Sequence, residues 1–210
     1  SYDDNNSRLY VQVNTGIENN ASWSNRNHII YLGTGSKKSS KYKNIMIGAD
    51  LDLVAHEYTH GVVQNLTELE KIYFGTTGTI NEAYADIFGC FAEAHWKNKN
   101  DWKMGESVTK WDCIRNIANP EKMGNPSKIG GKYFINYKSN DWKNSKINDR
   151  CGVHRNSTVI SHAAYIMNKK GITRGKLEKL WFTSLKLGYS KYSDFYDVRK
   201  NVLIAAKRLN

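Results

Sequence analysis

The chain has 210 residues, of which 40% are hydrophobic and 24% are charged; this length suits one large domain or two lobes that share a cleft, and the composition is that of a globular protein. The formal net charge is +11, yet the lysines are scattered through polar stretches such as SKKSSKYKN and WKNSKIND, without an arginine-rich helix or an aromatic RNA-binding motif, which argues against a nucleic-acid-binding protein. No apolar run approaches the roughly 20 residues that a membrane-spanning helix needs.

The first 50 residues predict short strands and turns. The stretch RLYVQV alternates between apolar and polar residues, and HIIYLGTGS is an apolar strand that ends in a glycine turn. The chain begins SYDDNNSRLY, which is polar and is not a signal peptide. Either a leader and a pro-segment have been removed, or the chain starts within a longer protein.

From Asp50 onward the pattern is mostly helical. The first predicted helix spans residues 50–66 and the second, which is more apolar, spans residues 79–98. Thr79 and Glu82 resemble a capping box, S/T-x-x-E, at the start of the second helix. On the first helix the predicted apolar face consists of Leu51, Val54, Ala55, Tyr58 and Val62.

Residues 100–152 are rich in Asn, Lys, Gly and Trp and predict a long irregular connection. Three more helices are predicted after it, at residues 158–171, 173–189 and 192–210. The last of these carries an apolar stripe that predicts packing against the core rather than ligand binding. The stripe consists of Phe195, Val198, Val202, Leu203 and Ala206.

The three cysteines are too few for a disulfide framework, and none lies in a CxxC pair that would suggest a zinc cluster. Cys113 and Cys151 could pair if the chain is exported, which leaves Cys90 as a small buried residue.

The stretch LVAHEYTHGVV places two histidines four residues apart with a glutamate after the first. On a helix, His56 and His60 project from the same face and can hold one metal ion. Glu57 lies close enough to take the proton of a water molecule that the metal activates. The alternative is an amphipathic helix that carries two histidines by chance, because H-E-x-x-H specifies only three positions.

A third ligand has to come from another element, because a catalytic zinc has three protein ligands and one open position. Glu82 and Asp86 lie four apart on the second predicted helix. Glu82 could bind the metal while Asp86 holds the far nitrogen of a ligand histidine. The alternative is that Glu82 only caps the helix and Asp86 faces solvent. The apolar flanks argue against it, because a bare buried aspartate is costly.

A third stretch, NDRCGVHRNSTVISHAAY, places His154 five residues after Asp149 and just before a predicted helix. A histidine oriented by a carboxylate can donate a proton or stabilise an oxyanion. We expect His162, inside the helix, to be structural, and we assign no role to His28 or His95.

Three motifs in this order, VAHEYTHGV, GTINEAYADIFG and GVHRNSTVISHAAY, resemble those of the thermolysin family of zinc metallopeptidases. The segments ENNASW, NDWKMGE and CIRNIANPEKMGNP extend the resemblance through most of the chain. The resemblance implies an α+β fold with the zinc site in a cleft between two lobes. A small β-rich N-terminal lobe, residues 1–66, would end in the active-site helix, and residues 67–210 would form a mainly α-helical C-terminal lobe.

The resemblance also implies a role for each matching residue. Zinc would be bound by His56, His60 and Glu82, with Glu57 as general base and Asp86 orienting His56. Tyr73, together with His154 held by Asp149, would stabilise the oxyanion. Asn20 and Ala21 would hold the substrate backbone, and Arg115 would bind a substrate carbonyl. Cleavage before bulky hydrophobic residues is expected, because the positions around the pocket after the scissile bond are apolar: Ile47, Leu53, Met104 and Ile114.

The chain departs from the family pattern in several places. The stretch between His60 and Glu82 is longer, which bears on the match of Tyr73. Lys103 and Ser107 replace acids of the family's calcium cluster, so at most one Ca²⁺ is expected. Its remaining predicted ligands are Asp52, Glu93, Asp101 and Glu106. The chain is also shorter than family members, as a compact variant or a core fragment would be.

The resemblance therefore predicts a secreted, extracellular zinc-dependent neutral endopeptidase that acts as a monomer on peptides or proteins, with neither nucleic acid nor membrane as a partner. One alternative is a catalytically idle zinc-binding homologue that serves as a binding module. The other is a basic module that binds nucleic acid or an anionic polymer, as the net charge allows.

Overall fold

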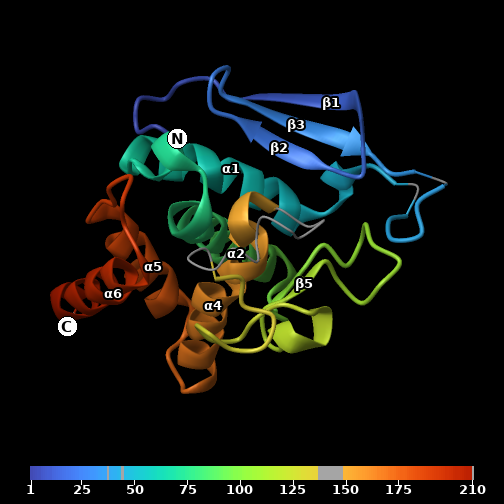
Figure 1. Ribbon diagram of the computed structural model, residues 1–210. Helices are drawn as coiled ribbons and strands as arrows, with labels where there is room; N and C mark the ends of the chain where they lie inside the picture. The colour runs from blue at the N-terminus through green and yellow to red at the C-terminus, as the bar shows by residue number, and fades with distance from the viewer. Residues whose placement is uncertain (37, 44, 137–148, 210) are drawn as a thin grey trace.

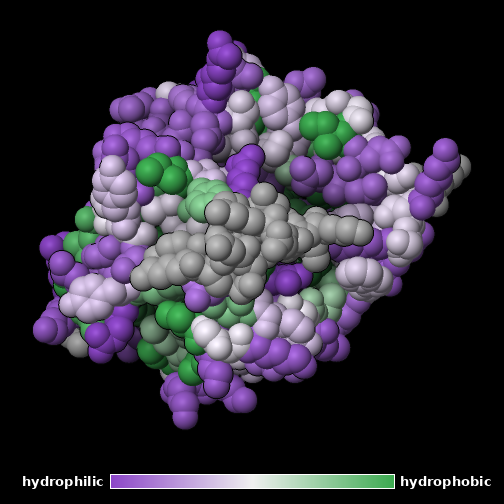
Figure 2. Space-filling model, in the orientation of Figure 1, coloured by the Kyte–Doolittle hydropathy of each residue, from purple (hydrophilic) through white to green (hydrophobic). Residues whose placement is uncertain are grey.

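The computed structural model describes residues 1–36, 38–43, 45–136 and 149–209 (Figure 1). The lysine-rich stretch at residues 142–148 lies outside the described residues. On the face seen in Figure 2, hydrophilic side chains predominate and hydrophobic ones lie in small separate groups. No helix among the described residues is long and apolar enough to cross a membrane.

The N-terminal part is a three-stranded sheet that lies over the first helix (Figure 1). The strands are β1 (Tyr10–Glu18), β2 (Ala21–Ser24) and β3 (Ile29–Thr34). Their order is β1-β3-β2, with β1 parallel and β2 antiparallel to the central β3. The strands predicted from RLYVQV and HIIYLGTGS are confirmed, and ENNASW supplies the edge strand β2.

The helices are α1 (Leu51–Leu66), α2 (Gly75–Lys97), α4 (Asp149–Lys169), α5 (Arg174–Lys186) and α6 (Phe195–Leu209). All five predicted helices are confirmed. The connections contain the short helices η1 (Ile47–Ala49), η2 (Leu69–Ile72) and η3 (Pro120–Met123), and a two-stranded ribbon of β4 (Lys103–Met104) and β5 (Arg115–Asn116). The α2 helix runs through the centre and packs against α1 on one side and α4 on the other (Figure 1).

The predicted capping box is wrong. The α2 helix begins at Gly75, four residues before the predicted start, so Thr79 and Glu82 lie inside it. Both side chains are buried. Glu82 is therefore available for chemistry rather than committed to the helix end.

The apolar face predicted for α1 is only partly covered. Leu51 is 38% exposed, and Val54, Ala55, Tyr58 and Val62 are only half-buried. The buried residues of this helix include Asp52, Leu53, His56, Glu57, His60 and Val63. Because α1 is covered by the sheet on one side and by α2 on the other, its chemically active face points into the protein.

Two glycines allow this close packing. A Cβ at Gly61 of α1 would lie 2.9 Å from the indole ring of Trp23 in β2, and a Cβ at Gly89 of α2 would lie 2.7 Å from the carbonyl oxygen of Asp52. Each glycine weakens its helix by about 1 kcal/mol relative to alanine. Without a side chain at these two positions, the sheet and α2 approach α1 closely enough to place their own side chains beside His56 and His60.

The C-terminal helices complete the core. Leu177, Trp181 and Leu185 of α5 are buried. On α6 the predicted stripe is wrong at Leu203, which is 48% exposed. Ala205 takes its place in the core, beside Val198 and Val202. The three cysteines are all free and buried, so Cys113 and Cys151 are not joined.

Candidate metal centre and catalytic cleft

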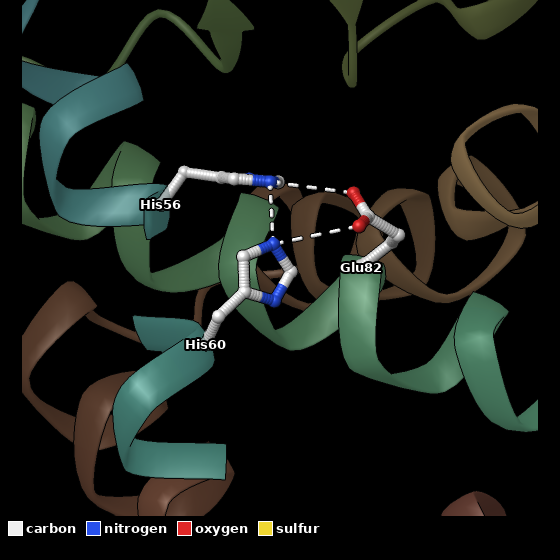
Figure 3. Close-up of side chains that lie close together, drawn as sticks. All are labelled: His56, His60 and Glu82. Atoms are coloured by element: carbon white, nitrogen blue, oxygen red, sulfur yellow. Dashed lines mark hydrogen bonds and ion pairs between the residues drawn. The ribbon is translucent and has the colours of Figure 1, made fainter. Parts of the chain in front are cut away.

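Three buried side chains from two helices converge on one point (Figure 3). The α1 helix presents His56 and His60 one turn apart, and α2 presents Glu82. The two Nε2 atoms of the histidines lie 3.1 Å apart. Glu82 Oε2 lies 3.3 Å from Nε2 of His56, and Oε1 lies 3.4 Å from Nε2 of His60. Candidate ligand atoms of these three residues all lie within 4.8 Å of one another.

The chemistry of these three groups fits zinc. Two imidazole nitrogens and one carboxylate are a ligand set that catalytic zinc sites use, with a fourth position left for water or substrate. Glu82 Oε2 is buried and has no hydrogen-bond partner among the described residues. A buried carboxylate oxygen without a partner is costly, and a cation at this point would satisfy it.

Outer partners fix the orientation of both histidines. Asp86 Oδ1 lies 3.0 Å from Nδ1 of His56, and Asn81 Oδ1 lies 2.7 Å from Nδ1 of His60. The contact is an ion pair at His56 and a hydrogen bond at His60, and in both cases a partner at Nδ1 leaves Nε2 free to bind a metal. Sequence reasoning found Asp86 but missed Asn81. The signal was available, because a buried polar residue beside a ligand on the same helix needs a partner.

Asp86 lies at the centre of a larger buried network. Its Oδ1 accepts hydrogen bonds from Nε and Nη2 of Arg115, at 3.0 and 2.5 Å, and its Oδ2 accepts one from the hydroxyl of Ser157 at 3.1 Å. Burial alone would raise the pKa of Asp86, but the Arg115 guanidinium and His56 outweigh it and lower the pKa. Asp86 therefore carries its negative charge behind His56.

The carboxylates of Asp86 and Glu82 favour a positive charge at this site. Burial opposes protonation of His56, yet Asp86 and Glu82 together raise its pKa to about 10. In the absence of metal a proton is therefore favoured on His56. A metal ion that binds here has to displace this proton.

The three residues open into a cleft of about 590 Å³ between β2, α1, α2 and the start of α4. Its lining consists of Asn20, Ala21, Ser22, Trp23, Asn25, His56, Glu57, His60, Glu70, Tyr73, Glu82, Asp149, Arg150 and His154. All four predicted catalytic side chains and both predicted edge-strand residues are thus brought to one cleft. Sequence reasoning missed Trp23, Glu70 and Arg150, which no metal or acid–base motif marks.

Tyr73 and His154 face the metal ligands from two sides. The Tyr73 hydroxyl donates a hydrogen bond to Oε1 of Glu82. Burial and the Glu82 carboxylate raise the pKa of this phenol, so that it remains a neutral donor. His154 Nε2 lies 3.4 Å from the same Oε1.

Asp149 holds His154 at the start of α4. Its Oδ1 lies 2.5 Å from Nδ1 of His154, and its Oδ2 accepts the backbone N–H groups of His154 and Arg155 at 3.1 and 3.2 Å. The cleft walls disfavour a charged imidazole, but Glu82 and Asp149 raise the pKa of His154. Since 48% of this side chain is exposed, it remains accessible from the cleft.

The other predicted substrate residues do not line the cleft among the described residues. The guanidinium of Arg115 is buried against Asp86. Three of the four apolar residues predicted for the pocket lie in the hydrophobic core, and the fourth, Ile114, is half-buried against it. The three core residues are Ile47, Leu53 and Met104.

A second group of carboxylates lies at the start of α1. The structure brings together Asp50, Asp52, Glu93 and Glu106. Asp101, which we predicted for this group, is not among its members, since its Oδ1 accepts the backbone N–H of Lys103 at an exposed turn. Asp50 takes the place that we predicted for Asp101.

Lysine side chains and bound protons neutralise the negative charge of these carboxylates only in part. Lys97 lies 2.5 Å from Glu93, whereas Lys103 bonds to Asp112 instead. Asp52 Oδ1 and Glu106 Oε2 are buried without a hydrogen-bond partner among the described residues. Burial and Asp50 raise the pKa of Asp52, and burial with nearby acids raises that of Glu106 to about 7.

We predict that Ca²⁺ stabilises the protein through this group, and more at about pH 7.5 than at about pH 5. The folded chain holds protons on Asp52 and Glu106 that the unfolded chain releases. The stabilisation from these protons is present below the ordinary carboxyl pKa of 4.5 and lost as the pH rises to about 7. Calcium replaces these protons. At a free Ca²⁺ concentration of about 100 times the dissociation constant, binding adds about 2.7 kcal/mol to the free energy of unfolding.

Thermal melting with and without Ca²⁺, at constant zinc, measures this effect. Asp50→Asn should reduce the calcium-induced shift in Tm, and the matched Asp194→Asn, at an exposed position just before α6, should leave it unchanged. Equal shifts at both pH values, or equal effects of the two substitutions, would contradict the assignment.

Two sequence profiles of one family match almost the whole chain. The profile described as "Thermolysin metallopeptidase, catalytic domain" matches residues 1–64, and "Thermolysin metallopeptidase, alpha-helical domain" matches residues 69–210. The chain belongs to the thermolysin family of metallopeptidases. Its α+β fold, with a small sheet and a helical C-terminal part, is the one that the thermolysin resemblance implied.

Named relatives of the thermolysin family are similar over the full chain. Neutral protease NprE of Bacillus pumilus is 31% identical over 212 residues, which are all of this chain and 63% of the relative. Neutral protease B of Bacillus subtilis (strain 168) is 30% identical over 223 residues, all of this chain and 37% of the relative. The chain thus spans less than two thirds of the length of these relatives.

A solved structure shows the same fold. The precursor of protealysin, a metalloproteinase from Serratia proteamaculans, superposes with a TM-score of 0.80 at 22% identity. The match covers all of this chain and 66% of that structure.

Proposed function

We propose that this chain forms the catalytic part of a zinc-dependent neutral endopeptidase. The observation that carries the proposal is the convergence of His56, His60 and Glu82 at the floor of a cleft that Glu57 also lines. Membership of the thermolysin family supports the same reaction class. Every residue to which the resemblance assigns zinc binding or catalysis lines this cleft.

When bound, zinc would polarise the scissile carbonyl and make a water molecule nucleophilic at neutral pH. The substrate lies extended along the edge strand β2, beside Asn20 and Ala21. Glu57 accepts a proton from the attacking water and then donates it to the leaving amine. Tyr73 and His154 donate hydrogen bonds to the oxyanion, and Asp149 keeps His154 oriented.

We propose that the residue after the cut is bulky and hydrophobic. Leu53 lies one turn before His56 on α1, and it belongs to the same apolar cluster as Ile47 and Met104. Ile114 packs against Gly105 at the edge of this cluster. A substrate side chain would reach this cluster beside the half-buried Ile114, and Nη1 of Arg115, which makes no bond to Asp86, would bind a substrate carbonyl.

We also propose a division of the chain into two lobes, an extracellular location and a monomeric state. Residues 1–66, with the sheet and α1, would form one lobe, and residues 67–210 the other. The protein would act as an extracellular monomer on peptides and proteins.

Removal of the metal tests the proposed function. A chelator should abolish cleavage of a peptide with an internal Gly-Leu or Ala-Phe bond, and added Zn²⁺ should restore cleavage in proportion to the zinc bound. Metal analysis of the same samples measures that proportion.

The same experiment separates the alternatives. An idle zinc-binding homologue would bind zinc and cleave neither peptide. A basic module would bind an anionic polymer with an affinity that falls steeply with salt and is insensitive to the chelator.

A further inference from the structure

The segment before the helical part of α4 has an uncommon backbone. Asp149, Arg150, Cys151 and Gly152 have φ values of 29°, 45°, 67° and 78°. The left-handed region costs non-glycine residues roughly 1–2 kcal/mol each. Packing holds the run in place, since Cys151 is buried and a Cβ at Gly152 would lie 2.8 Å from the side chain of Ile135. Arg150, between these residues, is exposed and lines the catalytic cleft.

The guanidinium of Arg150 rests on an aromatic ring. Its Cζ lies 4.8 Å from the centroid of Tyr73, and Tyr73 is itself held by its hydrogen bond to Glu82. Such a cation–π contact positions the guanidinium without using its N–H donors. Within the part of the chain that the structure describes, these donors have no hydrogen-bond acceptor, so they are available to a ligand in the cleft.

Of the four carboxylates that line the cleft with Arg150, Glu57 is the proposed general base and the other three are already engaged. Asp149 binds His154, and Glu82 faces the histidines. Glu70 accepts hydrogen bonds from Asn25 at one oxygen and from Asn81 at the other. Among the described residues, Arg150 forms no ion pair with any of them. Its positive charge thus faces the cleft without a carboxylate partner there.

The α1 helix shows on which side of the cut Arg150 lies. Leu53, where the proposed function places the residue after the cut, precedes His56 on this helix. Tyr73 packs instead against His60, a turn further along, with ring centroids 6.5 Å apart. Arg150 lies on Tyr73, so it lies on the side of the metal ligands away from Leu53. Residues that precede the cut would therefore pass Arg150.

We infer that Arg150 forms a subsite for an acidic side chain, Asp or Glu, within the residues that precede the cut. A guanidinium has a planar fork of donors that matches a carboxylate with two parallel hydrogen bonds. The inference rests on the proposed peptidase function and names a substrate class for it.

Paired peptides test the subsite. Each pair has a constant Gly-Leu or Ala-Phe bond and carries Glu or Gln at the first or second variable position before the cut. At the better of the two positions, we expect kcat/KM for the Glu peptide to exceed that for the Gln peptide by about tenfold. Arg150→Gln should bring this ratio to about one, and Arg150→Glu should favour a Lys peptide over the Glu peptide.

A matched control separates a local contact from the overall charge. Arg199→Gln makes the same change of charge at an exposed position of α6 and should leave the Glu-to-Gln ratio unchanged. If Arg150→Gln leaves the ratio at its original value, or slows both peptides equally, the inference is wrong. An equal loss would mean that Arg150 acts by positioning Tyr73.

Failure of the proposed function gives a different result. If neither peptide is cut, fluorescence anisotropy of labelled peptides on the zinc-loaded chain measures binding alone. A preference for the Glu peptide that Arg150→Gln removes would still support the subsite, and equal binding of both peptides would overturn it. Melting curves of each variant check that every variant is folded under the conditions of the assay.

Discussion

Replacing Glu57 with glutamine is expected to lower kcat for peptide hydrolysis by a factor of about 10²–10⁴ and to leave zinc bound. Glutamine keeps the size of the side chain but accepts no proton from water at neutral pH. Glu57 lines the cleft beside His56 and is not a member of the metal-binding group. The loss should therefore fall on the chemical step and not on the metal.

The measurement combines kcat on a peptide with an internal Gly-Leu bond with the zinc content of the same sample. Glu178→Gln is a matched control, because Glu178 lies on α5 outside the catalytic cleft, where it pairs with Arg174. The control should retain full activity. Activity that survives Glu57→Gln would exclude the mechanism, whereas loss of zinc in this variant would show that Glu57 acts on the metal site itself.

Replacing Asp86 with alanine is expected to destabilise the fold by about 3–5 kcal/mol, because it leaves a buried charge without its partner. Asp86 is fully buried and neutralises Arg115, and it also accepts a hydrogen bond from Ser157. It contacts His56 as well, so the affinity for zinc should fall by about 10–100-fold.

Chemical denaturation of the metal-free protein measures the first effect, and competition with a zinc indicator measures the second. Asp112→Ala is a matched control, since Asp112 also pairs with two cations, Lys103 and Lys122, but at the surface. It should change stability and zinc affinity little. A loss of stability in Asp86→Ala no larger than in the control would show that Arg115 finds another partner or water.

Much of the candidate metal centre follows from local periodicity. The helical spacing of His56 and His60 places both imidazoles on one face of α1 wherever that helix packs, and the same holds for Glu82 and Asp86 on α2. Five helices and two of the strands were predictable for the same reason, since hydrophobic repeats depend only on neighbours along the chain.

The sequence alone did not decide what Glu82 does. Its spacing from Thr79 matched a capping box as well as it matched a metal ligand. Only the earlier start of α2, at Gly75, and the packing of this helix against α1 place the carboxylate on the histidines. The face of α1 is a similar case. Sequence periodicity favoured Leu51, but the helix is covered on two sides, so burial does not follow its apolar stripe.

The sequence by itself determined which residues could carry chemistry and which of them share a helix. The tertiary structure decided which of them meet. Asp50 rather than Asp101 joins Asp52, Asn81 supports His60, and Arg150 reaches Tyr73 across 77 positions of the sequence. The physical reason is that periodicity records the environment of a residue relative to its neighbours along one helix or strand. Contacts between elements depend on how closely backbones approach, and here two glycines, Gly61 and Gly89, set that approach.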